Sequence, residues 1–148
     1  MNAKIISINI SANKGERKKA VDSAVLTENY GIESDAHASG EWHRQISLLA
    51  TESIKKMQDK GLDVGPGDFA ENFTTEGIDL VSLPVGTKIA IGEDIEMEVS
   101  QIGKVCHNRC AIYHQAGDCV MPKEGIFTKV LKGGTAKNGD EIKVISSK

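Results

Sequence analysis

The alternation of apolar and polar residues along the chain predicts mainly short β-strands. Ile95, Met97 and Val99, for example, alternate with Glu96 and Glu98, as expected for a strand with one buried face. Turns rich in glycine, proline or asparagine separate such segments. The segments expected to form strands are 4–10, 23–26, 45–49, 78–83, 87–91, 94–99, 125–131 and 141–145.

One segment, residues 51–60, has the pattern of a helix. Thr51 is its expected N-cap, and Glu52 lies in the first turn, where a negative charge interacts favourably with the helix dipole. Ile54 and Met57 form an apolar stripe, and Gly61 is the expected stop. Many short strands with closely spaced turns and one helix are typical of an all-β barrel. We therefore expect a mainly β fold, a closed or partly open and mostly antiparallel barrel with the helix packed on it.

The length and charge of the chain narrow its function. Its 148 residues fit a single domain, 1–148, that is long enough to bury a core. The 18 basic and 21 acidic residues give a net charge of -3 without blocks of like charge, so we expect neither a nucleic acid nor a membrane surface as partner. No segment approaches the ~20 apolar residues of a membrane helix, and the N-terminus lacks the pattern of a secretory signal. We expect a cytoplasmic protein with free thiols.

The segment 101–119 concentrates residues with chemical potential. It holds all three cysteines and two of the four histidines, and Lys104 and Arg109 flank Cys106. Positive charge nearby favours the thiolate, which is the nucleophilic and metal-binding form of cysteine. Cys106 is therefore a candidate reactive thiol, and the alternative is that it is a small buried apolar residue.

A second polar group lies in the glycine-punctuated loop before residues 45–49. It carries Asp35, His37, His43 and Arg44, and such loops are where functional groups concentrate. The alternative is that Asp35 forms a local turn and that the histidines are half-exposed loop residues.

Two further stretches carry polar residues. In residues 69–75, Phe69 and Phe73 are expected to point inward and to leave Glu71 and Asn72 at the mouth of a strand. The basic run 16–19 is expected to be a solvated face.

Four phrases taken together resemble the MOSC domain, named for the C-terminal domain of molybdenum cofactor sulfurase. They occur in the family's order between residues 31 and 134, and they are GIESDAHASGEWHRQISLL, PGDFAENFTTEGIDLVSLPVGTKIAIG, EMEVSQIGKVC and EGIFTKVLKGG. The resemblance implies a β-barrel of the pyruvate-kinase-barrel type. It also implies one key cysteine, matched by Cys106, that is thought to carry sulfur as a persulfide or to ligate molybdenum.

The resemblance also implies a site and a cofactor. The cofactor is of the molybdopterin type, and the partner is either this cofactor or a sulfur donor or acceptor protein. The implied pocket residues are Asp35, His37, His43, Arg44, Glu71, Asn72 and Thr74. Lys104 and Arg109, together with Arg44 and His43, are candidate partners of the pterin phosphate or of metal oxo groups. Glu71 or His37 could shuttle a proton if the site is that of an enzyme. Whether the chain is a sulfur transferase, a molybdenum-dependent oxidoreductase or a carrier without turnover stays open, and it has no room for a pyridoxal-phosphate domain.

The chain departs from the family pattern after Cys106. It adds Cys110, His114 and Cys119, which with Cys106 give the spacing C-x3-C-x3-H-x4-C and enough donors for a tetrahedral zinc ion. A structural or sensing zinc site is therefore the alternative function. A third possibility is an interaction module in which the cysteines are buried.

Overall fold

The computed structural model of the chain describes residues 3–11, 18–33, 35, 38, 40, 45–69, 71–103 and 124–146. Within this part, seven strands close into a barrel in the order β11-β7-β8-β9-β5-β6-β1, and β1 pairs with β11 to complete the ring. Their bounds are β1 Ala3–Ile10, β5 Ile46–Ala50, β6 Phe73–Glu76, β7 Lys88–Ile91, β8 Ile95–Ile102, β9 Ile126–Lys132 and β11 Glu141–Ser146. Among the described strand pairs, β5–β6 is parallel and the others are antiparallel.

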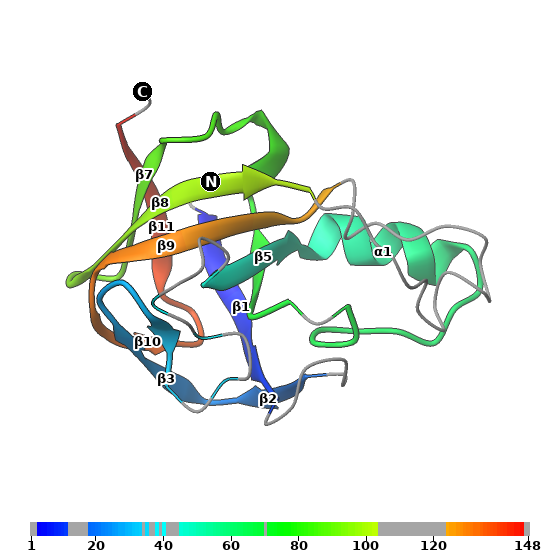
Figure 1. Ribbon diagram of the computed structural model, residues 1–148. Helices are drawn as coiled ribbons and strands as arrows, with labels where there is room; N and C mark the ends of the chain where they lie inside the picture. The colour runs from blue at the N-terminus through cyan, green and yellow to red at the C-terminus, as the bar shows by residue number, and fades with distance from the viewer. Residues whose placement is uncertain are drawn as a thin grey trace.

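Smaller elements attach to this barrel. Strand β2 (Lys19–Val21) pairs with the far end of β1. A separate three-stranded sheet is built from β3 (Ser23–Thr27), β4 (Gly31–Ile32) and β10 (Gly134–Lys137). The helix α1 (Thr51–Asp59) follows β5 directly and extends to the side of the barrel, and a 3-10 turn covers Leu80–Ser82 (Figure 1).

The barrel interior is apolar because alternate residues of every barrel strand point inward. Ile46 and Leu48 of β5 belong to the same buried cluster as Phe73 of β6 and Ile8 of β1. The intervening residue Leu49 faces the other side of the strand and packs in a second cluster. That outer cluster consists of Leu49, Ile54, Met57, Val64, Phe69 and Phe127. The helix is thus held against the outside of the barrel by apolar burial.

The structure confirms the mainly β, barrel-forming prediction and the helix in 51–60. Gly61 has a φ of +93° just after α1, as expected for a glycine that ends a helix. The predicted N-cap is wrong by one residue, because strand β5 runs into the helix without a loop. Ala50 takes the cap position, with no side-chain hydrogen bond, and Thr51 is already helical.

The strand expected at 78–83 is also wrong, since residues 80–82 form a 3-10 turn. The backbone N–H of Ser82 bonds to the carbonyl of Asp79 at 3.2 Å, and that of Leu83 bonds to the carbonyl of Leu80 at 3.1 Å. The Ser82 hydroxyl also donates to the Asp79 carboxylate, a local bond that favours a turn over a strand. Leu80 is buried in the barrel core.

Within the described residues, no helix has the length and apolar character needed to cross a membrane.

Candidate functional site

Small polar side chains line the outside of the barrel where β1, β6 and β5 lie side by side. Ser7 and Asn9 flank the core residue Ile8, and Thr74 follows the core residue Phe73, so strand alternation turns these polar side chains outward. We call the group the polar wall; its members are Ser7, Asn9, Ser47, Asn72 and Thr74. All five are buried, two of them to 7% and 6% exposure and the others completely. A buried polar surface requires partners for each group, and the wall supplies them.

Asn72 joins the two strands on either side of the wall. Its side-chain oxygen accepts hydrogen bonds from the backbone N–H of Ser47 at 2.9 Å and from the Ser47 hydroxyl at 3.2 Å. Its side-chain nitrogen donates to the carbonyl of Asn9 at 3.2 Å. The backbone of Asn72 also bonds to Ser47 and to Asn9, so the residue continues β6 between its two neighbours.

Glu71 is a carboxyl group buried against the wall. The Thr74 hydroxyl donates to it at 2.7 Å, and the backbone N–H of Phe69 donates at 3.3 Å. Asn9 in turn donates to the Thr74 oxygen at 3.1 Å. Burial raises the pKa of Glu71 above its ordinary value, and the hydrogen bonds from Thr74 and nearby backbone N–H groups offset this rise only in part.

Asp35 forms a buried ion pair with Lys18 beside the wall. The Lys18 Nζ lies 2.7 Å from Asp35 Oδ1, and both side chains are fully buried. Burial alone would raise the pKa of Asp35, but the hydrogen bond and charge of Lys18, the backbone N–H of Ser11 and the Asn72 side chain hold that pKa below its ordinary value. Asp35 is therefore an ionised carboxylate at neutral pH.

Residues 104–123 contain the three cysteines and are called the cysteine segment. The described residues on either side of them lie next to each other, since the Gly103 N–H donates to the Gly125 carbonyl at 2.7 Å. Neighbouring strands place Phe127 opposite both Ser47 and Gln101. Asn72, just before β6, therefore begins a row of neighbouring residues that continues through Ser47 of β5 and Phe127 of β9 to Gln101 of β8. Gln101 lies three positions before residue 104.

Glu124, the first described residue after the cysteine segment, is bonded to α1. Glu124 accepts a hydrogen bond from the Ser53 hydroxyl at 2.7 Å and forms an ion pair with Lys56 at 2.9 Å. A cavity of about 340 Å³ opens at this corner, and its lining includes Glu52, Ser53, Lys56, Asp79 and Glu124. None of the described residues predicted for the cofactor site belongs to this lining.

Four of the predicted site residues come together in the structure. Glu71, Asn72 and Thr74 belong to one short stretch of the chain, and Asp35, which is distant in sequence, meets them at the polar wall. The predictions for the remaining residues fall outside the described part of the chain; these are His37, His43, Arg44, Lys104, Cys106, Arg109, Cys110, His114 and Cys119. Among the residues that the structure does describe, no group of three or more His, Cys, Asp or Glu is placed to hold a metal ion.

Sequence reasoning missed several members of this network. The prediction that residues 16–19 form a solvated face is wrong at Lys18, which is 4% exposed, because the ion pair with Asp35 compensates its burial. Ser7, Asn9 and Ser11 were also missed. The signal for them is the alternation of short, uncharged polar residues with isoleucines along β1, which is unlike the charged face of an exposed strand.

Comparison with protein families identifies the family of this chain. The family model described as MOSC domain matches residues 35–143, most of the chain. The chain belongs to the MOSC family. This family is associated with the molybdenum cofactor. The match spans every candidate residue from Asp35 to Cys119, including the parts outside the described structure.

Solved structures with a similar fold support the barrel architecture. The chain is similar to the YUAD protein from Bacillus subtilis, with a TM-score of 0.80 and 21% identity over 97% of this chain and 96% of that one. It is also similar to YiiM from Geobacillus stearothermophilus, with a TM-score of 0.72 and 21% identity over 97% of this chain and 75% of that one. YiiM from Escherichia coli gives a TM-score of 0.72 and 19% identity over 100% of this chain and 71% of that one. The search of curated proteins found no match.

Proposed function

We propose that this MOSC protein handles the molybdenum cofactor, with Cys106 either carrying sulfur as a persulfide or binding molybdenum. The observation that carries the proposal is the convergence of Asp35, Glu71, Asn72 and Thr74 on one buried wall. A barrel alone does not need polar groups from distant segments to meet in this way. The row from Asn72 to Gln101 links this wall to the strand end from which the cysteine segment departs.

The described residues fit a supporting role toward the cofactor. Asp35, Glu71, Asn72 and Thr74 are buried and bonded within the protein, so they would hold the site's framework from behind. Direct contact would fall to the cationic residues of the two loops, since guanidinium and ammonium groups pair with phosphate. These residues are Arg44, Lys104 and Arg109, with the imidazole of His43 as a further candidate. When bound, the cofactor would supply a molybdenum centre for which a cysteine thiolate is a suitable soft ligand.

The sulfur-carrier form of the proposal is a thiol–persulfide exchange. The Cys106 thiolate attacks the terminal sulfur of a donor persulfide, the donor's S–S bond breaks, and the donor leaves as a thiolate. The new S–S bond joins Cys106 to the transferred sulfur, so no external oxidant or reductant is needed. The donor or acceptor would be a separate protein, and the exchange suits a reducing cytoplasm, where thiols stay free.

Coexpression with the cofactor biosynthesis pathway tests the proposal. The protein is purified without chelator and analysed for pterin, molybdenum, zinc and persulfide. We expect wild-type protein to retain cofactor or persulfide sulfur, Cys106→Ser to lose at least about nine-tenths of it, and Cys119→Ser to keep most of it, since only the sulfur-bearing residue is essential.

The zinc alternative predicts a different outcome. Stoichiometric zinc that is lost in both variants, together with equal and severe loss of stability, would identify a structural metal site, because structural zinc contributes directly to folding. Absence of pterin, molybdenum and persulfide from the wild-type protein would also overturn the proposal.

A further inference from the structure

Lys18 is a buried cation beside the polar wall, and its role in the candidate site follows from its contacts. Its ammonium group is fully buried and donates to Asp35 Oδ1 at 2.7 Å and to the Ser11 hydroxyl at 3.2 Å. Lysines are almost never fully buried without such partners, because removing the charge from water is costly. The cost of burying the Lys18 charge is offset only while Asp35 and Ser11 stay in contact with it.

The surroundings of Lys18 connect three segments that are distant in sequence. Ser11 follows strand β1, and its backbone N–H donates to the same Asp35 oxygen at 3.1 Å. The backbone N–H of Lys18 donates to the carbonyl of Gly67, at 2.9 Å, in the loop that leads to Glu71. Lys18 therefore contacts the end of β1, the loop after β4 and the loop before β6.

Asp35 lies near the start of the loop between Ile32 and Gln45. Its N–H bonds to the Ile32 carbonyl at 3.2 Å, and its carbonyl accepts from the Ala38 N–H at 3.2 Å. The two ends of this loop also lie against each other, since a Cβ on Gly31 would come within 2.8 Å of the Gln45 carbonyl oxygen. The same loop carries His37, His43 and Arg44 in the sequence.

We propose that Lys18 is a positioning residue of the candidate site, and that its ion pair with Asp35 fixes the described part of the loop around Asp35 and Ala38 against the polar wall. The role of Lys18 in positioning the cofactor or sulfur rests on the proposed function, whereas its role in fixing the loop is independent of that function. Lys18 acts through Asp35, and substitution of Lys18 leaves a buried carboxylate without its main counter-charge.

Amide hydrogen exchange tests the fixing of the loop. In Lys18→Met, which keeps an apolar stem and removes the charge, we expect exchange at the Asp35 and Ala38 amides to accelerate about a hundredfold, while amides in β7 and β8 keep their protection. Lys18→Arg, which keeps the charge, should restore most of the protection. If Lys18→Met does not fold, Ser11→Ala removes one acceptor of the ammonium and should accelerate the same two amides about tenfold.

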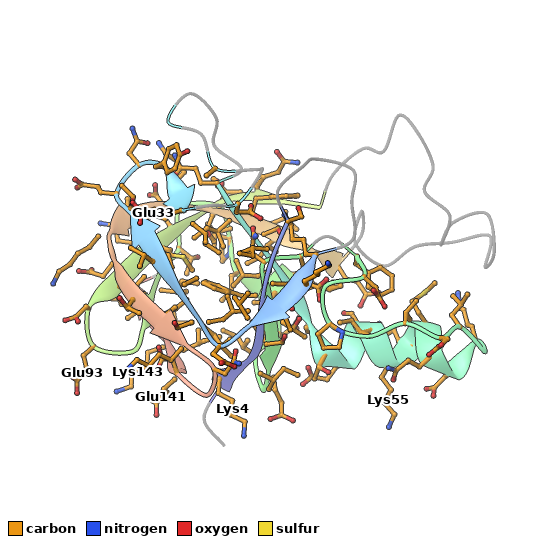
Figure 2. The ribbon with its side chains drawn as sticks, turned by 90° about the horizontal axis from the view of Figure 1, so that it is seen from below. Lys4, Glu33, Lys55, Glu93, Glu141 and Lys143 are labelled. Carbon is orange, nitrogen blue, oxygen red and sulfur yellow. The ribbon has the colours of Figure 1, made fainter. Side chains whose placement is uncertain are left out.

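Lys4→Met is the matched control for the loss of a lysine charge. Lys4 lies at the surface (Figure 2), 3.7 Å from Glu76 in an ion pair that is about half exposed. Its removal should leave exchange at Asp35 and Ala38 unchanged, because exposed ion pairs contribute little. Unchanged exchange of these amides in Lys18→Met, or acceleration spread evenly over the barrel, would overturn the proposal.

Retention of cofactor or of persulfide sulfur separates positioning from mere stability. We expect Lys18→Met to retain about a tenth of the wild-type amount at a temperature where it is folded, and Lys18→Arg to recover much of the loss. Ile89→Ala, which removes core packing from β7, controls for lost stability alone. Equal losses in Lys18→Met and Ile89→Ala would contradict a positioning role. If the wild-type protein itself retains nothing, the proposed function fails, and the exchange experiment still decides whether Lys18 fixes the loop.

Discussion

At the scale of single residues, the two buried carboxyl groups of the site have opposite electrostatic character. Asp35 is stabilised as an anion by Lys18, and its pKa is lowered. Glu71 is bonded to the Thr74 hydroxyl and to backbone N–H groups, and its pKa is raised. The candidate site thus combines a fixed negative charge with a buried carboxyl group that favours its proton.

The raised pKa of Glu71 predicts a pH dependence of stability. The native state holds a proton that the unfolded state loses near the ordinary value of 4.5, so this contribution to stability is complete below that pH. It is lost as the pH rises through the native pKa, with a slope of up to roughly 1.4 kcal/mol per pH unit. Glu71→Gln has no carboxyl group to titrate at this position. As the pH rises above 4.5, its free energy of unfolding should therefore fall less than that of the wild type.

Urea unfolding at a series of pH values measures this effect as the difference between variant and wild type. Glu76→Gln is the matched control, because Glu76 lies in the same strand, β6, but its side chain is 51% exposed. It should follow the wild-type profile. Parallel profiles for Glu71→Gln and the wild type would show that the carboxyl group does not titrate as expected.

At the scale of elements, the position of the loop before β6 depends on a glycine. Gly67 has a φ of +89°, and a Cβ there would lie 2.3 Å from the Lys18 carbonyl oxygen. Gly139 has the same φ, but a Cβ there would meet nothing within 4 Å. The pair separates the cost of backbone conformation from the cost of a steric clash.

Gly67→Ala should therefore destabilise the protein more than Gly139→Ala does. Both variants place alanine in a left-handed conformation, which costs roughly 1–2 kcal/mol. Only Gly67→Ala forces the loop away from Lys18, and overpacking of this kind adds roughly 1–3 kcal/mol. Urea unfolding of the two variants checks the difference, and equal losses would mean that the contact between Gly67 and Lys18 is not tight.

The elements also show what sequence patterns can and cannot predict. The alternation of Ile95, Met97 and Val99 predicts strand β8, because the side chains that a strand buries are set by their spacing along the chain. The burial of Lys18 depends on Asp35, which is 17 positions away in the sequence. No local pattern reports such a contact. The sequence therefore suggested Asp35 as a candidate site residue and did not indicate its partner Lys18.

At the scale of the whole molecule, the closed barrel fixes the relative positions of segments that carry the site. The parallel pairing of β5 with β6 places Asn72 beside Ser47, and the antiparallel pairing with β9 and β8 extends the row to Gln101. The family resemblance gave the barrel and the choice of Glu71, Asn72 and Thr74. The polar wall itself required the strand register, which the sequence patterns leave undetermined.

The proposed chemistry of the protein depends on one thiol, that of Cys106. The direct test is to incubate the protein with a low-molecular-weight persulfide, to alkylate it without reduction and to map the added sulfur by peptide mass spectrometry. We expect the transferred sulfur on the peptide of Cys106, a rate that falls as the pH is lowered because the thiolate is the nucleophile, and no transfer to Cys106→Ser. Cys119→Ser should be labelled like the wild type. Labelling spread equally over Cys106, Cys110 and Cys119, or undiminished labelling of Cys106→Ser, would contradict the account.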